Sequence, residues 1–323
     1  MKFRRLLLGV AALLVTLPCE VQAQNYPSRP IRLISPFPAG GGNDVLARII
    51  AAKLADRLAG SVVVENRPGA GAVIGIQTLA RSTPDGYTLV LGSSVLAVAP
   101  TLYKKAPFDP NKDFAPVALV AQYPFLLVAS ASLAAKTLPD LLAMAKENPG
   151  EITYASPGLA TSQHLFMEVL ETKTGIKLRH IPYNGTAPAV VDIVAGRVSL
   201  MFAAAAPSIP FFKNGTLRPL AVSSAARLAE LPEVPPVADT VPGFDEQNWS
   251  MILAPAGTPS DTVNKLHAEL KTVMAMPEVE KQLAAIGMMP IVSQSPKDLK
   301  AFISTEVERW GKIVQQAGMA GTH

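Results

Sequence analysis

The chain has 323 residues, a formal net charge of +4 at pH 7 and one cysteine. A single cysteine excludes a disulfide within the chain. The small positive charge is not gathered into a basic cluster and only 6% of the residues are aromatic, which argues against nucleic-acid binding. A chain of this length exceeds the usual size of one hydrophobic core, so we expect two domains.

The N-terminus has the pattern of a secretory signal peptide. A basic start precedes the apolar stretch Leu6–Leu17, and a small residue at Ala23 suits a signal peptidase. The apolar stretch is too short to span a bilayer, which takes about 20 residues. We therefore predict that residues 1–23 are removed and that the mature chain is periplasmic and has no cysteine. Lipidation at Cys19 is the alternative, although Pro18 before it fits a lipoprotein signal poorly.

The mature chain alternates predicted strands and helices, which is typical of an α/β fold with mostly parallel sheets. Residues 31–35 form the first predicted strand. The helix after it has apolar residues at helical spacing, at Val45, Leu46, Ile49, Ile50, Leu54 and Leu58. Further strands are predicted at 62–65 and 87–91, with a helix near 73–81 between them.

The rest of the chain divides into a second lobe and a return to the first. A polar break at 121–124 indicates a crossing between lobes, and the apolar run 249–254 indicates the return. We predict the boundaries of the domains as a signal peptide at 1–23, lobe 1 at 24–122 and 248–323, and lobe 2 at 123–247. Strands of the second lobe are expected at 152–155, 177–181, 200–202 and 217–222.

Two predicted helix starts have capping signals. Thr137 is followed three residues later by Asp140, and Ser295 is followed by Pro296 at the first helical position. Because the helix after Ser295 is apolar along one face, we expect it to pack onto the first lobe.

The sharpest local feature is the loop Gly40-Gly41-Gly42-Asn43-Asp44, which follows the first strand. Glycines let the backbone approach a ligand, and the unpaired N–H groups of a helix start attract an anion without any basic side chain. A plain turn, in which Asn43 or Asp44 caps the helix, explains the local pattern equally well.

The second lobe repeats this arrangement at 156–162, where Thr161 and Ser162 add hydroxyl groups before a helix. Alone, each loop is more often a turn than a site. Two such loops would face each other at the carboxyl ends of their strands, where open α/β sheets bind ligands. The pair therefore predicts a site between the lobes. Ser93 and Tyr183 follow other strands and could either contact a ligand or serve only the backbone.

Signals for an enzyme are weak. Residues 69–75 resemble a dinucleotide-binding fingerprint, but its last glycine lies one residue too far along the chain, which favours a structural loop. There is no Walker-type phosphate loop and no Gly-x-Ser-x-Gly motif. His164 and Glu168 are one helical turn apart without a third ligand in view, which favours a hydrogen bond over a metal site. We therefore expect no enzymatic activity, no metal and no cofactor.

A series of spaced motifs matches one known family. The motifs are Tyr26–Arg32, Pro36–Gly42 with Asp44, Val64–Gly71, Pro84–Leu89, Tyr103–Lys105, Asp113–Val117, Tyr154–Ser156, Thr161–His164, Pro182–Tyr183 and Leu253–Pro259. In them the chain resembles the Bug-type (TctC-like) substrate-binding proteins of tripartite tricarboxylate transporters. The resemblance covers essentially the whole mature chain.

The resemblance implies a two-lobed, type II periplasmic-binding-protein-like fold that closes like a Venus flytrap. It implies a small carboxylate held by backbone amides and ordered waters, and delivery of that ligand to membrane permease subunits by a protein that needs only to be a monomer. The implied ligand contacts are Ala39, Gly40, Gly41, Asn43 and Asp44 in the first lobe, Ser156, Pro157, Gly158, Ala160, Thr161 and Ser162 in the second, and Ser93, His164 and Tyr183 as contacts of second rank.

The chain departs from the family pattern after Phe202. Members often have Asp or Asn there, whereas Ala203 begins a run of four alanines. If Ala203 and its neighbours line the far end of the pocket, they offer neither a charge nor a side-chain hydrogen bond. We then expect a ligand whose distal part is apolar or aromatic, and an amino-acid ligand is less expected.

Three functional hypotheses follow. The first is a non-enzymatic receptor that delivers a carboxylate to a transporter. The second is an orphan or sensory binder that presents its closed form to a signalling partner in the membrane, which requires the same site. The third is a periplasmic enzyme acting on a phosphorylated substrate, which the lack of an acid–base set disfavours.

Overall fold

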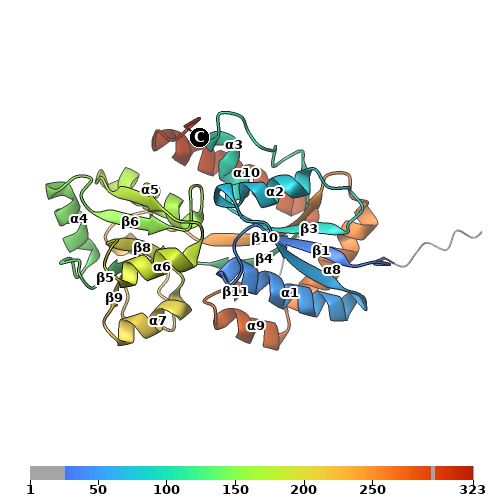
Figure 1. The fold of residues 1–323 in the computed structure, drawn as a ribbon, viewed down its shortest axis with the longest axis horizontal. Helices are drawn as coiled ribbons and strands as arrows, with labels where there is room; N and C mark the ends of the chain where they lie inside the picture. Colours follow the sequence, from blue (N-terminus) through green and yellow to red (C-terminus); the bar gives the residue numbers. More distant parts are fainter. Residues whose placement is uncertain (1–25, 292–294, 323) are drawn as a thin grey trace, which may run out of the picture.

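The computed structural model describes residues 26–291 and 295–322. The predicted signal peptide, with Cys19, lies outside the described residues. Two β-sheets, each flanked by helices, lie side by side along the long axis of the molecule (Figure 1). We call the six-stranded sheet with its helices lobe 1, and the five-stranded sheet with its helices lobe 2.

Lobe 1 has the strand order β11-β4-β10-β3-β1-β2. Its strands are β1 (Ile31–Ser35), β2 (Val62–Asn66), β3 (Thr88–Ser93), β4 (Phe114–Tyr123), β10 (Asn248–Pro255) and β11 (Met289–Pro290). β1 pairs in parallel with β2 and β3, whereas β10 runs antiparallel to β3 and β4. Every residue of β10 is buried, as expected for a central strand covered on both faces.

Lobe 2 has the strand order β7-β6-β8-β5-β9. Its strands are β5 (Leu126–Ser130), β6 (Thr153–Ser156), β7 (Arg179–Pro182), β8 (Leu200–Ala203) and β9 (Leu217–Val222). β6 pairs in parallel with β7 and β8, and β5 runs antiparallel to β8 and β9.

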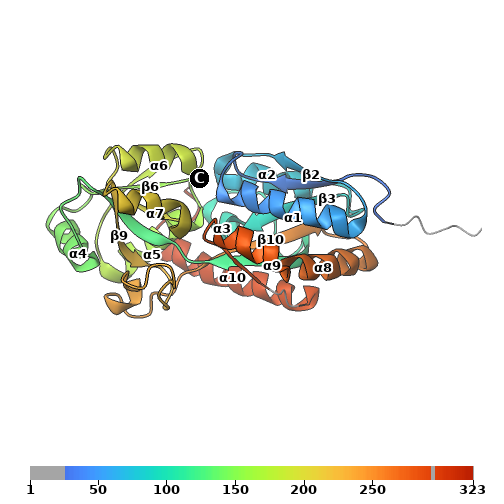
Figure 2. The same cartoon turned by 90° about the horizontal axis from the view of Figure 1, so that it is seen from below.

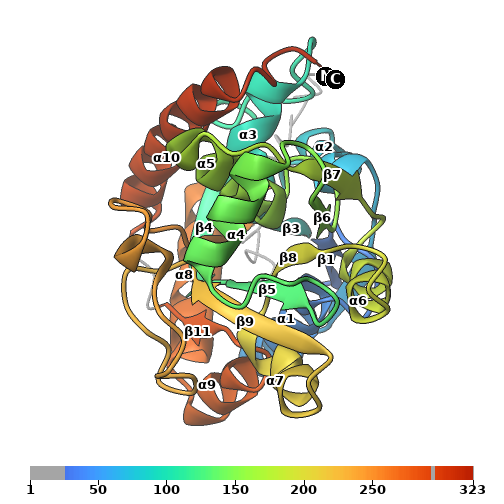
Figure 3. The same ribbon diagram turned by 90° about the vertical axis from the view of Figure 1, so that its left-hand side faces the viewer.

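Helices cover the sheets of both lobes. Those that follow lobe 1 strands are α1 (Gly42–Leu58), α2 (Val73–Ala80), α3 (Val95–Leu102), α8 (Ser260–Met274), α9 (Pro277–Ala284) and α10 (Pro296–Gln316). Those of lobe 2 are α4 (Leu138–Glu147), α5 (Ser162–Thr174), α6 (Thr186–Val194) and α7 (Ala205–Lys213), which surround its sheet in Figure 3. Short 3-10 helices are η1 (Ala70–Ala72) and η2 (Val237–Asp239). Within the described ranges, no helix is long and apolar enough to cross a membrane.

The predicted α/β class is confirmed, and both sheets are mixed: β10 and β11 in lobe 1 and β5 in lobe 2 run against the other strands of their sheet. The chain passes from one sheet to the other between β4 and β5 and back between β9 and β10, at the two predicted crossings. β5 and β10 each enter their sheet from the interlobe side. They are therefore antiparallel to their neighbouring strands, whose carboxyl ends lie on the interlobe side. The boundaries of the lobes to the residue stay a prediction.

The C-terminal helix α10 connects the two lobes. Ser295 caps its first turn as predicted, and the helix packs on α3 and β4 of lobe 1. It also reaches lobe 2, because the Trp310 ring stacks on Phe166 of α5 with ring centroids 6.2 Å apart. Arg309 forms an ion pair with Glu246, which precedes β10. Figure 2 shows α10 along the lower side of lobe 1, with one end beside α5 of lobe 2.

Candidate binding site between the lobes

A cavity of about 440 Å³ lies between the two lobes. Lobe 1 lines it with residues 37–43, and lobe 2 lines it with residues 161–163 and 184–188. The ends of the crossing strands close its rear with Tyr123 and Asn248. None of the described residues that line this cavity is charged. A charged ligand would therefore be held without a side-chain ion pair.

Four helices begin at the wall of the cavity. Their N-cap residues are Gly41 for α1, Thr161 for α5, Gly185 for α6 and Ala204 for α7, and all four line the cavity. None of these four residues caps its helix with a side-chain hydrogen bond, so no N-cap side chain satisfies the first N–H groups of these helices. Each start is also the positive end of a helix dipole. Uncharged residues thus build an electropositive wall that suits an anion.

Asp44 holds the lobe 1 loop in place and does not line the cavity. Its carboxylate accepts hydrogen bonds from the Gly40 amide at 2.9 Å, Asn66 Nδ2 at 2.7 Å and Arg48 Nε at 3.0 Å. Burial raises the pKa of Asp44, but the hydrogen bonds from Arg48, Gly40 and Asn66 outweigh it and hold the pKa below its usual range. Asn43 is fixed beside it, because Ser35 Oγ donates to Asn43 Oδ1 at 3.0 Å. Neither residue caps α1.

Two stacked histidines of lobe 2 contact its loop at 156–162. The His164 and His180 rings lie 4.1 Å apart between centroids. The Ala160 amide donates to His164 Nδ1 at 3.3 Å, and Ser156 Oγ lies 2.6 Å from His180 Nε2. Burial and the neighbouring His164 lower the pKa of His180 to about 3, so His180 is neutral at physiological pH. Ser156, Ala160 and His164 therefore shape the loop from inside lobe 2.

A hydrogen-bond chain joins the lobes behind the cavity. Ser94 Oγ of lobe 1 lies 2.7 Å from Ser162 Oγ of lobe 2. Ser162 also donates to Asn248, whose Nδ2 donates to the Tyr123 hydroxyl at 2.5 Å. Sequence reasoning missed Tyr123, Phe125 and Asn248 as lining residues. Their position at the two predicted crossings is the signal that could have found them, because crossing segments pass beside an interlobe cleft.

The structure places eight of the predicted site residues on the cavity wall, namely Ala39, Gly40, Gly41, Asn43, Ser93, Pro157, Thr161 and Ser162. The other seven are not on the wall, namely Asp44, Ser156, Gly158, Ala160, His164, Tyr183 and Ala203. Tyr183 instead donates its hydroxyl to Asp192 at 2.6 Å, and Ala203 is buried at the end of β8 while the next residue lines the cavity. That any of these residues contacts a ligand stays a prediction.

The cavity wall has hydrogen-bond donors but few side chains that could act as an acid or a base. Across residues 26–291 and 295–322, no group of three His, Cys, Asp or Glu side chains could hold a metal ion. His164 Nε2 lies 3.4 Å from Glu168 Oε1, and this pair is a contact inside lobe 2.

Comparison with known proteins decides the family. Residues 46–319 match the family described as "Tripartite tricarboxylate transporter family receptor". The chain belongs to this family. It is 36% identical to protein BugT of Bordetella pertussis over 323 residues, which covers 98% of this chain and 99% of that protein.

Similar solved structures have the same fold. Rpa4515 of R. palustris, solved with adipate, has a TM-score of 0.85 and 34% identity, over 91% of this chain and 99% of that one. MatC of Rhodopseudomonas palustris, solved with bound malate, has a TM-score of 0.83 and 28% identity, over 90% and 100%. The predicted periplasmic-binding-protein-like fold is therefore confirmed. The family consists of substrate-binding receptors and not enzymes, as predicted.

Proposed function

We propose that this protein is a periplasmic receptor that binds a small organic carboxylate between its lobes and delivers it to the membrane subunits of a tripartite tricarboxylate-type transporter. The observation that carries the proposal is the interlobe cavity, which has four uncapped helix starts and no charge among the described residues that line it. Such a wall attracts an anion yet releases it more readily than a buried ion pair would, which suits a protein that must give up its ligand.

The ligand is a carboxylate with a largely apolar body. Phe37, Phe125, Val190, Ile286 and Met288 also line the cavity and present carbon to the ligand. The alanine run contributes only Ala204 to the wall, and it does so at the start of α7, so this segment supplies backbone donors and no charged side chain. The adipate of Rpa4515 is itself a carboxylate with an apolar chain, which supports this ligand class.

A thermal-shift screen of the mature chain tests the proposal. The panel contains adipate, malate, benzoate, glutamate and a sugar phosphate, each at concentrations up to several millimolar. A ligand that binds only the folded state stabilises it by about 2.7 kcal/mol at one hundred times its dissociation constant. We expect adipate or benzoate to raise the melting temperature most. A rise only with the sugar phosphate, or turnover of it, would overturn the receptor proposal.

A matched pair of variants locates the binding site. Ala187 lines the cavity in the first turn of α6, where a carboxylate stabilises the helix but repels an anionic ligand. We expect Ala187→Asp to fold normally and to bind the carboxylate at least tenfold more weakly. Ala187→Asn has nearly the same shape without the charge and should lose much less affinity. Equal losses in isothermal titration would show that charge at this wall does not govern binding.

A further inference from the structure

One face of the lobe 1 sheet is only partly covered by a helix. Val63, Arg32 and Thr88 stand opposite one another in the register of β2, β1 and β3, so their side chains share one face. All three are exposed or half-buried, and Val63 keeps 52% of its surface. Parallel strands are normally covered on both faces, so this open patch is unusual.

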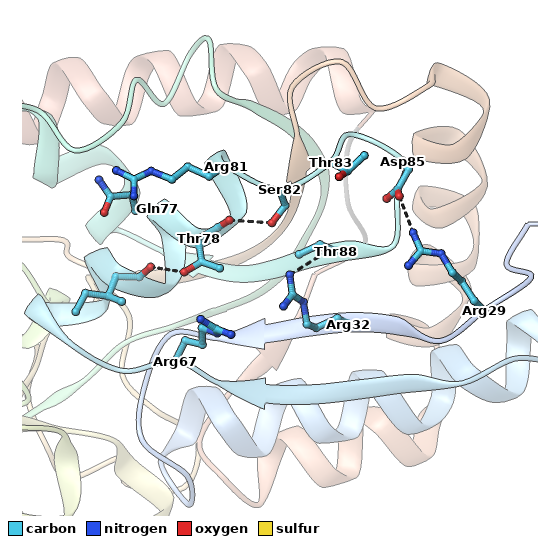
Figure 4. Close-up of a pocket in the computed structure, with 11 residues that line it drawn as sticks. Arg29, Arg32, Arg67, Gln77, Thr78, Arg81, Ser82, Thr83, Asp85 and Thr88 are labelled. Atoms are coloured by element: carbon cyan, nitrogen blue, oxygen red, sulfur yellow. Dashed lines mark hydrogen bonds and ion pairs between the residues drawn. The ribbon is translucent and has the colours of Figure 1, made fainter.

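The gap exists because α2 is short. This eight-residue helix ends at Ala80 and covers only the part of the face where Ile34 and Val90 are buried. The chain then turns back into β3 and leaves a hollow of about 600 Å³ beside the strands. Ile74 of α2 lines it and keeps 49% of its surface exposed. Figure 4 shows the hollow between α2 and the strands.

Four arginines stand around the hollow, and one of them has no acidic partner. Arg29 pairs with Asp85 at 2.6 Å, while Arg32 and Arg67 share the Glu65 carboxylate at 3.3 and 2.5 Å. Four positive charges against two negative charges leave an excess of two. Arg81, which is exposed at the end of α2, makes no ion pair with any residue in the described ranges. The patch is therefore positive, with Val63 and Ile74 as exposed apolar residues.

The hollow is too open to serve as a small-molecule pocket. The Arg29, Arg32 and Arg67 side chains keep 59%, 38% and 43% of their surface exposed, so a small solute would remain mostly in water. Exposed arginines around apolar residues are instead typical of a protein–protein interface. The face lies wholly on lobe 1, so it stays the same whether the lobes are apart or together.

We propose that this arginine face, formed by Arg29, Arg32, Arg67 and Arg81 with Val63 and Ile74, docks an acidic segment of a protein partner. Carboxylates of the partner pair with Arg81 and compete for the other arginines, and separate apolar side chains of the segment cover Val63 and Ile74. Such contacts guide association through charge and gain affinity by burying the apolar residues.

A defined peptide tests the proposal on the mature chain. The probe is a fluorescent peptide of glutamates interrupted by leucines, and its counterpart has lysine in place of glutamate. We expect only the acidic peptide to bind in fluorescence anisotropy, with amide shifts in nuclear magnetic resonance confined to β1, β2, β3 and α2. Raising the salt concentration should weaken binding, because exposed charges are screened.

Charge reversal at two exposed arginines separates docking from general attraction. Arg81→Glu should weaken the acidic peptide about fivefold or more, since it removes one attraction and adds a repulsion. Arg179→Glu makes the same change on the exposed edge strand of lobe 2 and should have little effect. Equal weakening by both variants, or no binding of the acidic peptide, would overturn the proposal. Carboxylate binding between the lobes should be unchanged in both variants, so the two proposals fail separately.

Discussion

Asp44 shows how a residue can hold the wall of a cavity in place without lining it. Its buried carboxylate gathers the Gly40 amide, Asn66 and Arg48, and so fixes the loop that forms one wall of the cavity. A charged group among such donors is stabilised in its ionised form. Asp44 therefore shapes the loop, and Arg48, whose Nε lies 3.0 Å from the Asp44 carboxylate, offsets its negative charge.

We expect Asp44→Asn to lower the free energy of unfolding by about 1.5–3 kcal/mol at pH 7, because hydrogen bonds to a charged acceptor are lost. The pKa of Asp44 is lower in the folded than in the unfolded chain, so this stabilisation is present above the unfolded value of about 3.9 and is lost as the pH falls through the folded pKa. The difference between variant and wild type should therefore shrink in acid.

Denaturant unfolding at several pH values measures this difference. Asp56→Asn is the control, because Asp56 lies exposed on the same helix. A constant difference down to the acid limit would contradict the ionised role of Asp44.

At the scale of elements, glycines let the two lobes meet. A side chain on Gly71 of η1 would place its Cβ 2.2 Å from the carbonyl oxygen of Leu159 in the lobe 2 loop. Gly185 likewise faces Pro38 of lobe 1, because a Cβ added at Gly185 would lie 3.0 Å from Pro38 Cγ. Residues 69–75, which resemble a nucleotide fingerprint, thus contain a contact point between lobes, in agreement with the predicted structural loop.

We expect Gly71→Ala to weaken ligand binding at least tenfold, because the added methyl group holds the lobes apart. Gly175→Ala is the matched control. Both glycines have positive φ, +60° and +72°, so both changes cost roughly 1–2 kcal/mol in backbone strain. Only Gly71 has a neighbour in the way, since no atom lies within 4 Å of a Cβ at Gly175.

Isothermal titration with the carboxylate identified by the thermal screen, together with small-angle X-ray scattering, provides the two readouts for this pair. The Gly71 variant should keep a larger radius of gyration when ligand is added. If both variants bind equally well, the Gly71–Leu159 contact does not limit closure.

At the scale of the whole molecule, α10 ties the lobes into one body. Trp310 is buried against Phe166 of α5, and Glu306 accepts hydrogen bonds from the indole nitrogens of Trp249 and Trp310 at 2.7 and 2.9 Å. The larger hydrophobic core runs without a break from lobe 1 into α5 of lobe 2. We therefore expect that any closure of the lobes bends the crossing strands while this contact persists.

We expect Trp310→Ala to lower the free energy of unfolding by about 3–5 kcal/mol, because it leaves a cavity between α10 and α5. Trp310→Phe keeps a ring against Phe166 and should lose less than half as much. Phe302→Ala removes an aromatic residue of α10 that contacts Trp249, and it should leave the coupling of the lobes intact. Thermal unfolding by calorimetry compares the three variants, and a smaller loss for Trp310→Ala than for Phe302→Ala would refute the connecting role.

Much of this protein could be predicted from local pattern. Apolar runs broken by glycine and proline predicted the strands and helices, and Thr137 with Asp140 predicted the capping box that opens α4. The spaced motifs indicated the family, and the two glycine-rich loops predicted where the lobes would face each other. These signals are local because backbone conformation depends mainly on near neighbours in the chain.

The sequence alone determined the α/β class, the crossings and the loops that form the site, because each depends on residues a few positions apart. Tertiary structure decided which of those residues face the cavity. Asp44 points away from the cavity because it accepts a hydrogen bond from Asn66, which lies 22 positions away in the chain. Ser162 likewise bonds to Asn248, which lies 86 positions away. A buried polar side chain points towards the group that forms its hydrogen bond. When that group is distant in the chain, only the folded chain brings the two together.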